Sequence, residues 1–179
     1  MKHIYKLFLA INATSWVVVI FGIKNEWAIA LLPSWFLCVL LLFIPVILSG
    51  ISIFLSYFLK KDNIEDCCEL KEANSSFLPI YLGYFFVGLN ISEMPHLIFV
   101  YLIILIFTYV AQTQYFNPIF LLFGYRFYKA KTAKGTWIFI ITKGNLRRAD
   151  EVYFNNLRRI NDTTFISRSN KDESTDSKN

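Results

Sequence analysis

Charged residues are scarce in this sequence of 179 residues, and their absence from long stretches limits what the protein can be. They make up 17% of the chain, whereas a soluble domain carries roughly 25%. Asp, Glu, Lys and Arg are missing from four stretches, residues 7–23, 27–59, 73–92 and 94–125. A soluble protein this small has no core large enough to bury four such runs. The shortage of charge therefore excludes a soluble enzyme, a disulfide-stapled secreted module and a disordered protein.

Residues that ligate metals or perform catalysis are few as well. The two histidines, His3 and His96, are far apart in the sequence, and there is no HExxH, glycine-rich phosphate loop, GxSxG or carboxylate pair. Of the three cysteines, Cys38 lies in an apolar run, and the adjacent Cys67 and Cys68 lack the ligand spacing of zinc sites. We therefore expect no enzymatic activity, no metal and no other cofactor.

Apolar residues, in contrast, make up 55% of the chain, and the charge-free runs are rich in them. A helix crosses a bilayer with about 20 apolar residues, so each run is long enough, or nearly so, for a transmembrane helix. A signal peptide is the competing interpretation of the first run, but its length exceeds a usual signal core and no small-x-small cleavage site precedes Lys24. Proline suits a first helical turn, so the second helix should begin at Pro33 and the later two near Pro79 and Pro95.

The two later helices must be antiparallel neighbours, because only a few residues around Glu93 separate them. We therefore predict an α-helical membrane protein with four transmembrane helices in two hairpins, joined by the acidic segment 60–76. With four spans, the N-terminus, this middle segment and the C-terminus share one side of the membrane and hold 17 of the 18 Lys and Arg residues. Basic loops face the cytoplasm, so both termini are expected to be cytoplasmic.

The sequence changes character at Arg126, where we predict a small cytoplasmic β-rich C-terminal domain. Residues 125–132 and 136–142 are rich in aromatic and β-branched residues, and the short glycine-containing turn between them predicts a β-hairpin. A lone hairpin is marginal in water, so residues 152–157 and 163–166 are expected to cover it. The chain is thus divided into a four-helix transmembrane domain, a cytoplasmic β-hairpin domain and a disordered polar tail, at residues 1–116, 117–166 and 167–179.

Three serines form a stripe of small polar residues in the second span, at spacing i, i+3 and i+7. Small residues let helices approach closely, so helix packing is one interpretation, and a polar seam that lines a pore is the other. No ring of charge accompanies the stripe, which favours packing. Four short helices bury little in one chain, so we predict a homo-oligomer that packs through Ser49, Ser52 and Ser56.

Two basic pairs flank the sequence VYFNNL in the C-terminal segment, which places aromatic residues between the charges. Attraction to anionic membrane lipid explains the charge, and so does docking of an acidic or nucleic-acid-bound cytoplasmic partner. Lipid attraction does not need the aromatic residues, whereas interface cores favour arginine together with aromatic side chains. We therefore predict a partner-binding surface made of six residues: Arg147, Arg148, Tyr153, Phe154, Arg158 and Arg159.

Residues 117–166 are the most distinctive part of the sequence. They contain NPIFLLFGYRFYKAKT, then TWIFIITKGNLRRADEV, then LRRINDTTFI, and they follow the four spans. In this arrangement the chain resembles the membrane subunit of the Kiwa bacterial anti-phage defence system (KwaA). The resemblance implies a sensor of phage attachment or envelope disturbance in the bacterial inner membrane. It further implies a tetramer and a cytoplasmic DNA-binding partner from the same operon, so that this chain itself binds no nucleic acid.

Three function classes remain at this stage. A non-enzymatic sensor and scaffold is favoured by the resemblance and by the large cytoplasmic C-terminal segment. The alternative is a pore-forming effector that depolarises the membrane, which ion flux on expression would reveal. A small transporter is disfavoured because the spans contain no charge and the sequence has no internal repeat.

Overall fold

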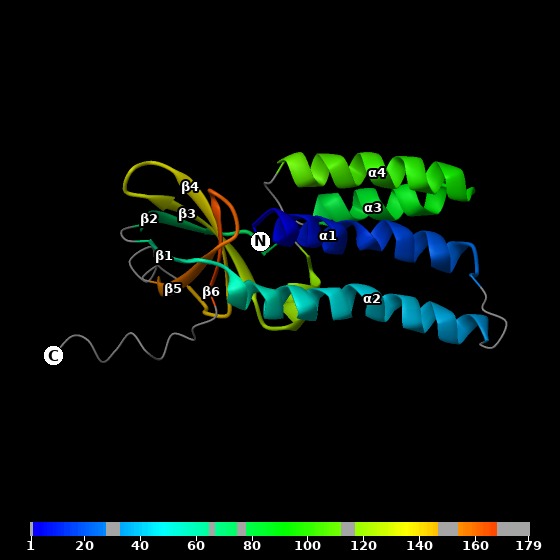
Figure 1. Cartoon of the computed structure of the whole chain (residues 1–179), viewed down its shortest axis with the longest axis horizontal. Coiled ribbons are helices and arrows are strands. Elements are labelled where there is room, and N and C mark those ends of the chain that lie inside the picture. Colours follow the sequence, from blue (N-terminus) through cyan, green and yellow to red (C-terminus); the bar gives the residue numbers. More distant parts are fainter. Residues whose placement is uncertain are drawn as a thin grey trace. The chain divides into compact units, whose positions relative to one another are not determined.

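The computed structural model describes residues 2–27, 33–64, 67–74, 78–111, 117–146 and 154–167. The chain forms two compact units, a helical one and one built on a β-sheet (Figure 1). Each unit combines segments that are distant in the sequence. The helical unit takes its residues from His3–Phe54 and Ser76–Ile119, and the sheet unit takes most of its residues from Leu55–Ser75 and Phe120–Asn179.

Four long helices form in the described part of the helical unit, where the sequence is apolar. Their bounds are α1, Lys2–Lys24; α2, Ser34–Leu55; α3, Leu78–Asn90; and α4, Met94–Ala111. Pro33 directly precedes α2, and Pro79 and Pro95 lie in the first turns of α3 and α4, where a missing backbone N–H costs nothing. The predicted starts of these helices are therefore confirmed.

Within the part of the chain that the structure describes, three helical segments are long and apolar enough to cross a membrane: His3–Lys24, Trp35–Phe58 and Met94–Ala111. The remaining helix, α3, has 13 residues and is therefore about 20 Å long, which is short of a hydrocarbon core of about 30 Å. The described residues thus confirm a helical membrane-type unit but not the predicted count of four spans.

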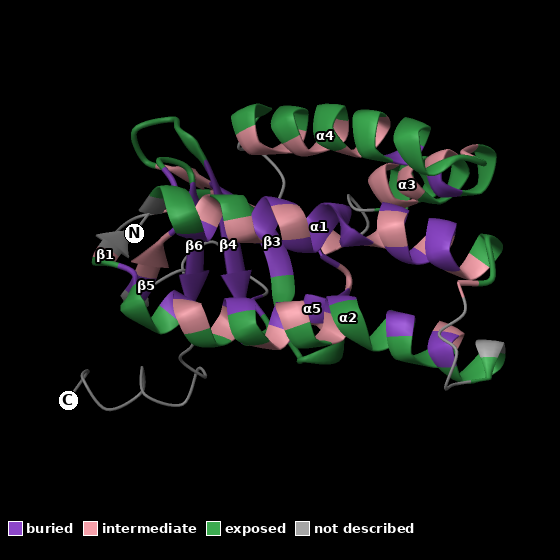
Figure 2. Cartoon of the chain, turned by 45° about the vertical axis from the view of Figure 1, so that its right-hand side comes forward, coloured by how far each residue is buried: buried purple, intermediate pink, exposed green. Residues whose placement is uncertain are grey.

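Helix α1 is the central helix of this unit, and α4 is the most exposed. In the α1 span 56% of the residues are buried, against 6% in the α4 span, which Figure 2 draws almost entirely in the colours of exposed and intermediate residues. Helix α3 approaches α1 closely at Gly88, where an added Cβ would lie 2.9 Å from Cγ2 of Ile20 and 3.1 Å from the carbonyl oxygen of Val17. Leucine and phenylalanine side chains on α4 face outward, as expected of a surface that meets lipid.

Among the described residues of the sheet unit, six strands lie in the order β1-β5-β6-β4-β3-β2, in which β4 and β6 run parallel and the other pairs are antiparallel. The bounds are β1, Lys61–Ile64; β2, Cys67–Glu72; β3, Arg126–Thr132; β4, Trp137–Thr142; β5, Phe154–Arg159; and β6, Thr164–Ser167. The predicted hairpin is β3 and β4, and the predicted covering segments supply β5 and β6. The middle segment was expected to be a connection, but it contributes β1 and β2. The sheet unit is therefore built from two segments of the chain, one that begins at Leu55 and one that begins at Phe120.

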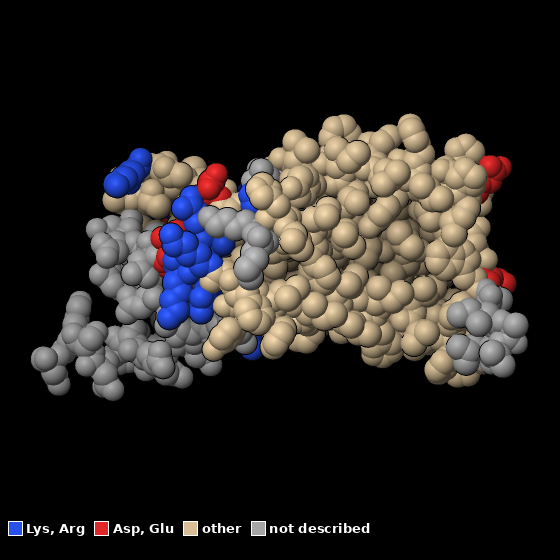
Figure 3. Space-filling model, in the orientation of Figure 1, with Lys and Arg blue, Asp and Glu red and all other residues tan. Residues whose placement is uncertain are grey.

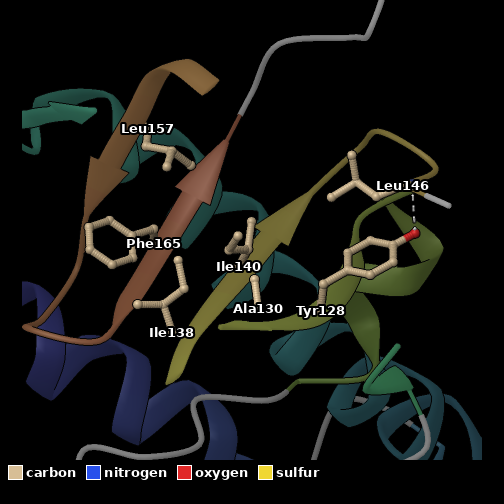
Figure 4. Close-up of a cluster of buried hydrophobic side chains, with 7 residues drawn as sticks. All are labelled: Tyr128, Ala130, Ile138, Ile140, Leu146, Leu157 and Phe165. Atoms are coloured by element: carbon tan, nitrogen blue, oxygen red, sulfur yellow. Dashed lines mark hydrogen bonds between the residues drawn. The ribbon is translucent and has the colours of Figure 1, made fainter. Parts of the chain in front are cut away.

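The sheet is strongly curled, because a very short connection joins its two edge strands, β1 and β2. Ile64 ends β1 and Cys67 begins β2, so their Cα atoms are at most about 11 Å apart. A flat sheet would separate the edges of six strands by about 24 Å. The curled sheet encloses an apolar core, shown in Figure 4, made of Tyr128, Ala130, Ile138, Ile140, Leu146, Leu157 and Phe165.

Two local features support this sheet. The turn between β3 and β4 needs a positive φ of 83° at Gly135, a conformation that a residue without Cβ adopts at little cost. The short helix α5, Ile119–Leu122, was not predicted; it places Phe120 edge-on against Tyr125 and Phe127, with ring centroids 6.1 and 6.3 Å away. The expected disordered tail lies outside the described residues from residue 168 onward.

Candidate functional site

A cluster of four polar side chains is buried within the helical unit. Its members are Asn12 on α1, Ser49 and Ser52 on α2, and Asn117, which precedes α5. Asn12, Ser49 and Ser52 are fully buried, and Asn117 is 1% exposed. We call these four residues the polar cluster. A buried amide is costly unless it is hydrogen-bonded, so the pairing inside the cluster decides whether it is stable.

The two asparagines satisfy each other and both serines. The Asn12 amide group donates to the hydroxyls of Ser49 and Ser52, at 3.2 Å each. The Asn117 amide group donates to Oδ1 of Asn12 at 2.9 Å and to Oγ of Ser49 at 3.0 Å. Each asparagine therefore uses both of its N–H donors and its carbonyl oxygen.

Asn117 also organises the chain that follows it. Its Oδ1 accepts a hydrogen bond of 3.0 Å from the backbone N–H of Ile119, the first residue of α5. From α5 the chain continues directly into β3 at Arg126. A displacement of α1 against α2 would therefore disturb the hydrogen bonds of the residue from which α5 starts.

The serine stripe is enclosed by its own chain. The Ser49 and Ser52 hydroxyls also reach the carbonyl oxygens of Pro45 and Leu48, at 2.7 and 2.9 Å. Ser56 is fully buried as well, in the short 3-10 helix that continues α2. These contacts fit the packing interpretation within one chain, and the predicted contact of the three serines with a second copy stays a prediction.

Arg158 and Arg159, two residues of the predicted partner surface, are bound within the sheet unit. The Arg158 guanidinium donates to the carbonyl oxygen of Leu59 at 2.7 Å and lies 5.7 Å from the centroid of the Tyr57 ring. Arg159 lies 2.9 Å from Asp162 and 3.6 Å from Asp62, which belongs to β1. Both arginines therefore hold the β1 edge in place, which the sequence alone did not indicate.

The other four predicted partner-binding residues are described less fully. Arg147, Arg148 and Tyr153 lie outside the described residues, and of Phe154 only the backbone, at the start of β5, is described. The structure therefore brings Arg158 and Arg159 together with β1 and leaves the remaining predicted surface as a prediction.

The outer side of β2, β3 and β4 carries a second group of basic residues, which sequence reasoning did not single out. Lys71, Lys129 and Lys131 lie on one side of the sheet with Trp137, and Figure 3 shows lysine and arginine side chains gathered on this unit. We call these four residues the lysine face. Glu69 lies beside it, and its hydrogen bond to the Lys131 ammonium, at 3.0 Å, lowers the pKa of the Glu69 carboxyl below its usual value.

No group of three His, Cys, Asp or Glu residues that could hold a metal ion occurs in the part of the chain that the structure describes. Cys67 is half-buried against the apolar core of the sheet, and Cys68 is exposed. The polar cluster offers neutral amides and hydroxyls, which suit hydrogen bonding between helices better than they suit metal binding.

Comparison with known proteins gives one match. The family model described as "Anti-phage protein KwaA" matches residues 5–166, which include both the helical unit and the sheet unit. A search of curated proteins and a search of solved structures each found no match.

Proposed function

Since the chain belongs to the anti-phage protein KwaA family, we propose that it is a non-enzymatic sensor and scaffold in the bacterial inner membrane. In this role it detects phage attachment or envelope disturbance through its helices and holds a cytoplasmic DNA-binding partner through its sheet unit. The partner, and not this chain, would contact nucleic acid. The observation that carries the proposal is that strands from before α3 and from after α4 in the sequence pair in one sheet.

The pairing of the strands supports a common side of the membrane for the segments that form the sheet. Strand β1 pairs with β5 and β2 pairs with β3, so segments before α3 and after α4 belong to one sheet. A sheet cannot be divided by a bilayer, so the chain between β2 and β3 crosses the membrane an even number of times. Because α4 is long enough to cross, this supports α3 as a second, shorter crossing that precedes it.

The sheet side of the membrane also carries most of the positive charge. Fifteen of the 18 Lys and Arg residues lie in the middle segment or from Arg126 onward, a count that does not depend on the number of spans. The excess of basic residues on cytoplasmic segments supports a cytoplasmic sheet unit. A cytoplasmic position is what the recruitment of a DNA-binding partner requires.

The polar cluster supports the sensing half of the proposal. Interfaces that switch are built from contacts with discrete alternatives, and a hydrogen-bonded cluster in an apolar surrounding is such a contact. A shift between α1 and α2 would break bonds at Asn12 and Asn117 together. The start of α5 would respond because Asn117 accepts from the backbone N–H of Ile119.

The recruiting surface is proposed to include the basic pair Arg147 and Arg148, since Arg158 and Arg159 are committed to the sheet. The test is a pull-down from detergent extract of the protein encoded by the neighbouring gene. Replacing both residues, Arg147→Glu with Arg148→Glu, should abolish co-purification, because it reverses two charges on the interface. The control is Lys134→Glu with Lys143→Glu, which reverses two exposed charges elsewhere in the sheet unit and should leave binding intact.

Equal recovery of the partner by both double variants would contradict this recruiting surface. Collapse of the membrane potential on expression, with no partner bound, would favour the pore-forming effector instead. The polar cluster gives that alternative little support, because its hydroxyls and amides are already paired within one chain.

A further inference from the structure

We propose that the lysine face of the sheet unit, Lys71, Lys129, Lys131 and Trp137, binds the headgroups of anionic phospholipids. This site shares no residue with the proposed recruiting surface, and its test needs neither the partner nor phage.

The strand register places like charges directly opposite one another. Lys71 on β2 and Lys129 on β3 are Cα partners, so their side chains leave the sheet on the same side as neighbours. A directly opposed like-charge pair destabilises a sheet. Lys131 lies on this side too, two residues along β3 from Lys129. A bound anion would relieve the repulsion between these ammonium groups.

The nearby carboxylate only partly offsets the three lysines. Glu69 lies 3.0 Å from the Lys131 ammonium and 3.8 Å from that of Lys71. Among the described residues, Lys129 has no ion pair, and its side chain is exposed. The face therefore keeps a net positive charge of two, with Lys129 open to a ligand.

An exposed indole completes the face. Trp137 is 42% exposed, and the ammonium groups of Lys71 and Lys131 lie 5.2 and 5.8 Å from the centroid of its ring. Tryptophan and lysine side by side suit the boundary of a bilayer, where the ring enters the headgroup layer and the ammonium groups meet phosphate.

Two observations favour lipid over a protein or nucleic-acid ligand. Protein interfaces are enriched in arginine and depleted of lysine, whereas the three basic residues of this face are all lysines. The chain also passes from Lys71, near the end of β2, to the first residue of the apolar helix α3 in seven residues. The covalent link thus keeps the face within reach of a bilayer, where local lipid is abundant.

The experiment uses the purified full-length protein in nanodiscs made of phosphatidylglycerol or of phosphatidylcholine, each with acyl chains brominated near the glycerol. The fluorescence of Trp137 is obtained by subtracting the emission of the Trp137→Phe protein from that of the wild type. This subtraction removes the signal of the other three tryptophans. Quenching of this difference signal in phosphatidylglycerol, and much less in phosphatidylcholine, is expected. Salt at 0.5 M, an ionic strength with a Debye length of only about 4 Å, should reverse it.

Lys129→Glu is the informative variant because misfolding does not explain its expected effect. It places opposite charges at the Lys71–Lys129 position, so the melting temperature should stay the same or rise slightly. The ratio of docked to undocked protein should nevertheless fall roughly thirtyfold, since the reversal removes two units of attraction to lipid. Lys143→Glu is the matched control: Lys143 also lies over a ring, 5.2 Å from the centroid of Tyr125, and quenching should persist.

Equal quenching in the two lipids would overturn the proposal, as would quenching that Lys129→Glu leaves unchanged. Adding a DNA duplex or an acidic protein tests whether the face binds one of these macromolecules instead of lipid. If either protects Trp137 from quenching while phosphatidylglycerol has no effect of its own, the face binds that macromolecule and not lipid.

Discussion

Asn12 and Asn117 are 105 residues apart in the sequence, yet the amide group of Asn117 donates to Oδ1 of Asn12 at 2.9 Å in a fully enclosed site. The bond joins the first helix of the chain to the residue from which α5 starts. With Ser49 and Ser52 it forms a set of buried polar groups that satisfy one another. These four residues thus form a paired polar contact between segments that are far apart in the sequence, and altering that contact should have measurable effects.

Asn117→Leu should destabilise the helical unit. It removes the hydrogen bonds to Asn12 and Ser49 and leaves the buried backbone N–H of Ile119 without its acceptor, which costs about 1–3 kcal/mol, with helix contacts in membranes at the lower end. Thermal unfolding of the purified protein in detergent measures the loss. Asn90→Leu is the control, because the exposed Asn90 amide bonds only within its own helix, to the carbonyl oxygen of Phe86. Equal melting temperatures for the two variants would show that the polar cluster adds no stability.

The same Asn117→Leu protein should also fail to protect cells from phage while it still co-purifies with the partner. The reason is that the cluster acts in sensing, whereas recruitment uses the sheet unit. Protection is measured at a temperature at which the variant remains inserted and folded. Full protection under these conditions would remove the polar cluster from the sensing mechanism.

Gly88→Ala should weaken the packing of α3 on α1. The added methyl group would lie 2.9 Å from Cγ2 of Ile20, so the helices must move apart. A loss of about 1–3 kcal/mol is expected from such overpacking. Gly83→Ala provides the matched control in the same helix, since nothing lies within 4 Å of its added Cβ, and it should be neutral or stabilising by up to about 1 kcal/mol. The prediction is contradicted if the two alanine variants melt at the same temperature.

Arg158→Ala should loosen the β1 edge of the sheet. The change leaves the carbonyl oxygen of Leu59 without its 2.7 Å bond and removes the contact with Tyr57. Local opening of β1 should then become about tenfold more frequent, from a loss of about 1.4 kcal/mol. Hydrogen exchange of the backbone amides of Lys61–Ile64 measures this, with Lys134→Ala in the exposed β3–β4 turn as control. An unchanged hydrogen-exchange rate of these amides in Arg158→Ala would show that Arg158 does not stabilise β1 and is available to bind a partner.

Some of the fold could be predicted because its signals are local. The hairpin of β3 and β4 follows from aromatic and β-branched residues on either side of a turn with Gly135, and the helix starts follow from proline. Strands β1 and β2 gave no such signal. Their sequences, KDNI and CCELKE, are short and polar, and they become strands only by pairing with β5 and β3, which come much later in the chain. The strand propensity of a short segment carries no information about pairing with a strand so far along the chain.

The site shows the same limit. Asn12, Ser49 and Ser52 could be found as polar residues in apolar runs, but residue 117 was predicted only as the start of the C-terminal domain. A polar residue followed by proline at that boundary was the available signal. Arg158 and Arg159 resembled a free basic pair in the sequence, whereas their partners Leu59 and Asp62 lie almost a hundred residues earlier.

The most direct test of the sensor and scaffold function is the distribution of the partner between membrane and cytosol. Cells that express the neighbouring gene product with this chain, without it, or with the Arg147→Glu and Arg148→Glu variant are fractionated before phage is added, and the membrane potential is recorded. The account predicts that the partner is in the membrane fraction only with the wild-type chain, and that the potential is intact. A partner that remains cytosolic in all three strains, or a potential that collapses before phage is added in the strain with the wild-type chain, would contradict it.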